Sequence, residues 1–94
     1  MENCYLAMKV SFCTQFYELS QYFGVVYEDL RELFILDPRV NPSHTYVYRW
    51  QPFYDSDCLN KDTKALANMT NATFLKGMIA WNEWMKNKYQ NKKD

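Results

Sequence analysis

One stripe of large apolar side chains near the end of this 94-residue chain constrains its fold more than any other feature. The spacing is three or four residues, so at about 100° per residue the side chains share one side of a helix. Charged and polar residues fall on the opposite side. The stripe predicts a continuous helix over about 74–89 that packs its apolar side onto the rest of the chain. Its members are Phe74, Met78, Trp81, Met85 and Tyr89, and the first four are expected to point inward.

A shorter apolar pattern before this stripe predicts another helix. Asp62 or Thr63 can open it, and it is expected to run to Met69. Its phase does not continue into the stripe, so the sequence predicts a break near residues 68–71.

Two more helices are predicted in the first half of the chain. Thr14 is expected to cap the first, and Gly24 to end it, because a left-handed residue after a helix costs glycine little. The second is expected to bury Leu30, Leu33 and Phe34. It should stop at residue 37, because the following proline disfavours helical geometry in the residue before it.

Two segments show the period-two alternation that is typical of strands. Residues 5–12 alternate Leu6, Met8, Val10 and Phe12 with other residues, and residues 45–50 place Tyr46, Tyr48 and Trp50 on one face. We expect the two segments to pair. The sequence therefore predicts a single α+β domain, 1–94, which is dominated by about four helices and carries one two-stranded β element.

Composition adds a prediction about the surface. Apolar residues make up 48% of the chain and aromatic residues 18%, which is more aromatic side chain than a small core normally absorbs. Some Tyr and Trp side chains should therefore lie at the surface, where they are typical of binding patches.

The segment 15–34 resembles the helix-turn-helix of phage-repressor-type DNA-binding proteins. Leu19, Phe23 and Val25 stand at the hydrophobic positions of that motif, and Gly24 stands at its turn. Ser20 departs from the alanine that the family favours. The resemblance implies two packed helices, of which the second would enter a DNA groove.

Charge on that second helix argues against DNA. It carries Glu28, Asp29 and Glu32 against a single cation, Arg31, whereas DNA-binding proteins neutralise phosphates with Lys and Arg. Up to residue 57 the chain holds four basic and eight acidic residues, and afterwards seven lysines and three acidic residues. The acidic side of the second helix therefore suits a partner protein with a basic surface. The predicted partner-binding residues are Glu28, Asp29, Arg31, Glu32, Ile35, Tyr46 and Tyr48.

Sites for catalysis are not indicated. His44 is the one histidine, and the three cysteines lack the close pairing of zinc ligands, so no metal is predicted. Only two glycines are present and no glycine-rich phosphate loop, so no cofactor is predicted either. We expect a protein that is not an enzyme.

The start of the chain has no pattern of a secretory signal and no run of about 20 apolar residues, so the sequence predicts a cytoplasmic protein with reduced cysteines. The expected function is binding, and inhibition, of a host protein with a basic surface, in the style of small phage or mobile-element proteins. That partner could itself handle nucleic acid. A helix-turn-helix DNA-binding regulator is the alternative, and a homodimer stays open.

Overall fold

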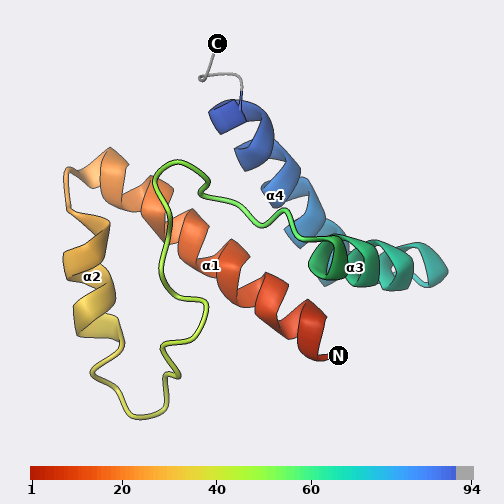
Figure 1. The fold of residues 1–94 in the computed structure, drawn as a ribbon, viewed down its shortest axis with the longest axis horizontal. Coiled ribbons are helices and arrows are strands. Elements are labelled where there is room, and N and C mark those ends of the chain that lie inside the picture. Colours follow the sequence, from red (N-terminus) through yellow and green to blue (C-terminus); the bar gives the residue numbers. More distant parts are fainter. Residues whose placement is uncertain (91–94) are drawn as a thin grey trace.

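The computed structural model describes residues 1–90, and within them it contains four helices and no strand (Figure 1). The helices are α1 (Glu2–Phe23), α2 (Tyr27–Phe34), α3 (Asp57–Met69) and α4 (Thr73–Gln90). The predicted α+β class is therefore wrong, and the described part of the chain is all-α. The molecule is flat, with extents of 40 × 38 × 20 Å. Helix α1 crosses its middle, with α2 on one side and the pair α3 and α4 on the other (Figure 1).

The first predicted strand, residues 5–12, lies inside α1. The buried side of this helix is made of small residues at helical spacing, among them Cys4, Ala7, Ser11 and Thr14. Small side chains let neighbouring helices approach closely, but they give a weak hydrophobic signal. The larger residues between them are only partly buried or, like Phe12, exposed. Their alternation therefore suggested a strand where the small residues specify a helix.

Thr14 is correspondingly not a helix cap. It is buried in the middle of α1, where its Oγ1 donates to the Ser11 carbonyl at 3.1 Å. The same Oγ1 accepts a hydrogen bond of 2.9 Å from the Trp81 indole of α4.

The second predicted strand, residues 45–50, belongs to the long loop between α2 and α3. Its alternation is real, because Thr45 and Val47 are buried while Tyr46 and Tyr48 are exposed. The expected partner segment is helical, however, so no ladder forms. Within residues 1–90 the backbone pairing is limited to one isolated bridge, between Tyr48 and Gln51.

The turn between α1 and α2 is confirmed. Gly24 has φ 72 and ψ 27, which is the left-handed conformation, and its N–H bonds back to the end of α1. Helix α2 ends at Phe34, earlier than predicted, and Leu33 is 70% exposed. Phe34 is also exposed and only Leu30 packs against the core, so the predicted inward set for this helix is mostly wrong.

The break after Met69 and the continuous helix α4 are confirmed. Met78 and Met85 are buried as predicted, but Phe74 is 67% exposed. Helix α3 begins several residues earlier than expected, at Asp57. Ser56 caps it, since its Oγ accepts a hydrogen bond from the Leu59 backbone N–H at 3.2 Å.

The core contains two clusters of buried residues that pack against α1. One contains Cys13, Tyr17, Tyr27 and Val47. The other contains Ala7, Tyr54 and Met78. Each cluster includes one residue of the long loop, so the loop crosses α1 as part of the core (Figure 1).

Candidate functional site

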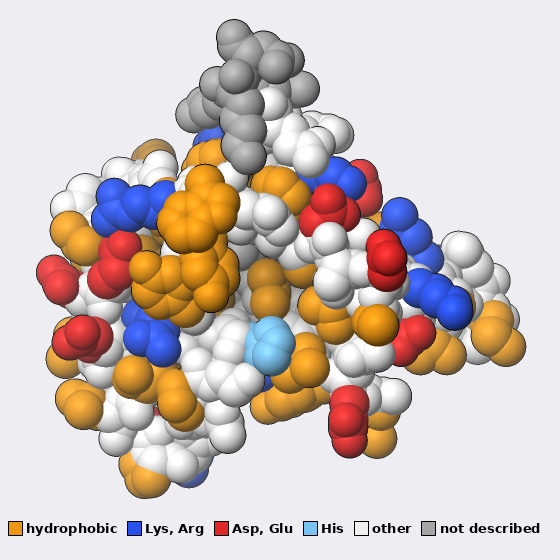
Figure 2. Space-filling view, in the orientation of Figure 1, with side chains coloured by type: hydrophobic (Ala, Val, Ile, Leu, Met, Phe, Trp, Pro, Cys, Tyr) orange, Lys and Arg blue, Asp and Glu red, His pale blue; other side chains and the backbone are white. Residues whose placement is uncertain are grey.

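Three aromatic side chains of the loop form an exposed row, which we call the aromatic patch: Tyr46, Tyr48 and Trp50. They are 48%, 51% and 63% exposed. The ring centroids of Tyr46 and Tyr48 lie 4.9 Å apart, and those of Tyr48 and Trp50 lie 5.1 Å apart. Figure 2 shows a large hydrophobic cluster on this face of the molecule, flanked by basic and acidic side chains. The prediction that some Tyr and Trp lie at the surface is confirmed.

Arg31 connects the aromatic patch to α2. Its Nε donates to Thr45 Oγ1 at 2.9 Å, and its guanidinium lies over the Tyr46 ring, 5.7 Å from the centroid. Cation–π contact of this kind favours a fixed arrangement of ring and cation. The phenol of Tyr27 supports the same segment by donating to the Thr45 carbonyl at 2.7 Å.

Arg49 adds a second connection that the sequence did not reveal. Its guanidinium forms an ion pair of 3.0 Å with Glu28. The backbone N–H of Glu28 and this arginine both donate to the carboxylate, and together they lower its pKa. Arg31 is therefore not the only cation beside the acidic side chains of α2, as the sequence suggested.

The structure brings most of the predicted partner-binding residues together. Arg31, Tyr46 and Tyr48 form a continuous set of contacts, and Glu28 joins them through Arg49. Asp29 and Glu32 are exposed on α2, as expected. Ile35 is only partly buried and caps the end of the helix. Trp50 belongs to this surface as well, although the predicted partner-binding residues did not include it. Its place in the Tyr46–Tyr48–Trp50 alternation is the sequence signal that indicates it.

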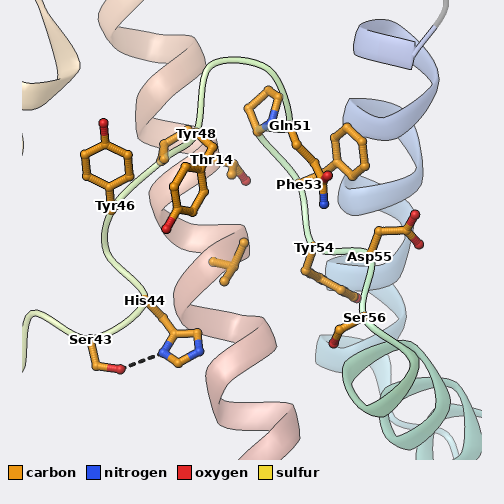
Figure 3. A pocket seen from close by; sticks show the side chains of 13 residues that line it. Thr14, Ser43, His44, Tyr46, Tyr48, Gln51, Phe53, Tyr54, Asp55 and Ser56 are labelled. Carbon is orange, nitrogen blue, oxygen red and sulfur yellow. Dashed lines mark hydrogen bonds between the residues drawn. The ribbon is translucent and has the colours of Figure 1, made fainter.

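A cavity of about 450 Å³ lies behind the aromatic patch, between the two arms of the loop and α1 (Figure 3). One arm contributes His44, Tyr46 and Tyr48, and the other contributes residues 51–56. His44 has φ 63, a conformation that non-glycine residues rarely adopt. Its Nδ1 lies 2.6 Å from Ser43 Oγ, within hydrogen-bond distance. Aromatic and polar side chains thus meet in one cavity.

The second arm is fixed to α4 by a reciprocal pair of hydrogen bonds. The Tyr54 backbone N–H donates to Asn82 Oδ1 at 2.9 Å, and Asn82 Nδ2 donates to the Tyr54 carbonyl at 2.9 Å. Next to it, Asp55 accepts from Asn60 at 3.0 Å and from Lys86 at 3.2 Å. Both contacts lower the pKa of Asp55.

The three cysteines are free thiols; Cys4 and Cys13 are buried and Cys58 is exposed. Burial raises the pKa of Cys13. Within residues 1–90, no three His, Cys, Asp or Glu side chains come together in a way that could hold a metal ion. In the same range no helix is both long and apolar enough to cross a bilayer.

A protein-family model matches residues 1–86 of the chain. Its description is the UDP-glucose/GDP-mannose dehydrogenase family, central domain. Since the match covers nearly the whole chain, the chain belongs to this family. It matches no curated protein and no solved structure.

Proposed function

We propose that this member of the dehydrogenase family binds a protein partner through the aromatic patch and the charged side of α2, without catalysing a reaction by itself. The observation that carries the proposal is the contact set of Trp50, Tyr48, Tyr46 and Arg31 at the surface.

The residue types in the patch are those that dominate interface energetics. Trp, Tyr and Arg are enriched among the few residues that carry most of the binding free energy. The patch is also largely preorganised, because Arg31 and the three rings already hold one another in place. A partner would therefore immobilise few additional side chains on binding, and this lowers the entropic cost of association.

Exposed carboxylates on α2 define the partner's chemistry. Asp29 and Glu32 are exposed on α2, next to the Glu28–Arg49 pair. A basic surface on the partner would be attracted to them, and such attraction acts mainly on the association rate. The partner we propose is therefore a protein with a basic surface that surrounds a pocket for Trp50.

The test compares two exposed tryptophans in a quantitative capture experiment from cell extract. Trp50 is 63% exposed in the patch, and Trp84 is 51% exposed on α4. We expect Trp50→Ala to lose a basic partner that Trp84→Ala retains. The double variant Asp29→Lys with Glu32→Lys should slow association and flatten its salt dependence. If Trp84→Ala loses the partner while Trp50→Ala retains it, the binding surface is α4 and the proposal is wrong.

A second candidate function is binding of a nucleotide sugar in the cavity behind the patch. Two observations favour it: the family description names UDP-glucose and GDP-mannose, and the cavity of about 450 Å³ has the size of a ligand pocket. Its aromatic rings could stack on a base, and its polar side chains could bind sugar hydroxyls.

Calorimetric titration with UDP-glucose and with GDP-mannose tests this candidate. Gln51 lines the cavity but lies outside the aromatic patch. We expect Gln51→Ala to weaken nucleotide-sugar binding and to leave capture of the protein partner unchanged. Absence of saturable binding of either compound would remove the candidate.

A further inference from the structure

A second pocket lies between α1 and α2, apart from the aromatic patch. It has a volume of about 130 Å³ and presents only apolar surface. Three phenylalanines form its rim, and two buried residues of the core, Cys13 and Tyr27, line it. The complete lining is Phe12, Cys13, Phe16, Tyr27, Leu30, Arg31 and Phe34.

The polar groups of the lining are already engaged elsewhere. The Tyr27 hydroxyl donates to the Thr45 carbonyl, and Arg31 Nε donates to Thr45 Oγ1. The thiol of Cys13 is kept neutral at ordinary pH, because burial raises its pKa. The pocket therefore offers a bound molecule few hydrogen-bond partners, and its accessible surface is apolar although Arg31 belongs to the lining.

Such a pocket suits an apolar molecule better than water. An apolar ligand that fills the pocket removes this apolar surface from water, which is favourable. We infer that the pocket between α1 and α2 binds a small, uncharged, apolar ligand of about the size of a benzene ring. This site shares Arg31 with the proposed protein-binding surface but none of the rings of the aromatic patch.

The rim gives such a ligand access. Phe12, Phe16 and Phe34 are 48%, 40% and 40% exposed, so the pocket opens to solvent. Ring contacts keep the rim in shape: the centroids of Phe12 and Phe16 lie 4.9 Å apart, and those of Phe12 and Phe34 lie 6.2 Å apart. A ring that enters would contact these faces and edges, an arrangement that aromatic groups favour.

Benzene is the probe for the test, and NMR chemical shifts of backbone amides provide the readout. Cys13 lines the pocket, whereas Cys58 is exposed at the start of α3. We expect benzene to bind saturably, at one site, and to shift the amide signals of Cys13 and of the other lining residues. The amide signal of Cys58 should not move. Equal shifts at both cysteines, or no saturable binding, would overturn the inference.

A matched pair of substitutions on α2 assigns the binding to this pocket. Leu30→Phe enlarges a residue of the lining, and Leu33→Phe makes the same change at an exposed position outside it. A mismatch of one methylene group between a ligand and an apolar pocket costs about 10–200-fold, and phenylalanine adds more carbon than this, so Leu30→Phe should weaken benzene binding about tenfold or more. Leu33→Phe should leave it unchanged. If Leu30→Phe does not fold, Phe34→Ala replaces it: removal of this rim contact should also weaken binding, and unchanged affinity there would refute the assignment.

Discussion

Asn82 is the residue through which α4 holds the loop, and we expect its replacement by alanine to be strongly destabilising. Its side-chain amide both accepts from the Tyr54 N–H and donates to the Tyr54 carbonyl, each at 2.9 Å. Asn82 and Tyr54 are buried, at 4% and 5% exposure. Alanine cannot replace either hydrogen bond, and water has little access to the backbone groups that are left.

The size of the effect follows from these two unpaired groups. A buried donor or acceptor that loses its partner costs about 1–3 kcal/mol. Two such groups give a loss of about 2–6 kcal/mol in the free energy of unfolding, before any further loss from the small void. Domains of this kind have a total of about 5–15 kcal/mol, so the variant would lose a large share of its stability.

Urea unfolding followed by tryptophan fluorescence measures this loss. With a slope of about 1.5 kcal/mol per molar urea, a loss of 3 kcal/mol moves the midpoint by about 2 M. Asn87→Ala is the control, because Asn87 is an exposed residue of the same helix and the change in helix propensity is the same. A midpoint for Asn82→Ala within error of that for Asn87→Ala would refute the reasoning.

Three further predictions concern stability and can be measured by the same unfolding experiment. Thr14→Val leaves the Trp81 indole N–H without its acceptor, so we expect a loss of about 1–3 kcal/mol, whereas Thr73→Val at the exposed start of α4 should cost less. Gly24→Ala should destabilise by about 1–2 kcal/mol, because φ 72 is unfavourable for alanine. Gly77→Ala inside α4 should instead stabilise by up to about 1 kcal/mol, since its added Cβ meets no atom within 4 Å. The folded-state pKa of Asp55 is lowered, so its carboxylate stabilises the folded state fully above the unfolded pKa of about 3.9. This stabilisation is lost as pH falls through the lower folded pKa. Asp55→Asn should therefore reduce the acid-induced loss of stability below about pH 4, and an unchanged pH profile would contradict this.

The sequence predicted those helices whose signals are local. The stripe of α4 is long and made of large residues, and Gly24 has a conformational reason to end α1. The first half of α1 could not be recognised in the same way, because its buried positions hold Cys4, Ala7 and Ser11 rather than large apolar residues. Hydrophobic periodicity detects where large side chains recur, and in α1 many of these point outward.

The candidate site was predictable in its residues but not in its contacts. In the sequence, a period-two alternation indicates Tyr46 and Tyr48, and the charge pattern of the second helix indicates Arg31. That Arg31 lies over Tyr46, and that Arg49 reaches Glu28, depends on the path of the loop across α1. This path is set by hydrogen bonds between distant segments, such as Tyr27 to Thr45, for which the sequence carries no local signal.

The attachment of α2 has a consequence for hydrogen exchange. Among the described helices, α2 contacts α1 alone, and its other support comes from the loop, at Thr45, Tyr46 and Arg49. Local openings expose backbone amides at a free energy set by the contacts that must break. We therefore expect the amides of α2 to exchange through a partial opening, well below the free energy of global unfolding, while the amides at the centre of α1 exchange only when the whole domain unfolds. Replacement of Tyr27 by phenylalanine removes the bond to Thr45 and should speed exchange in α2 and in the loop together, which would identify them as one cooperative unit.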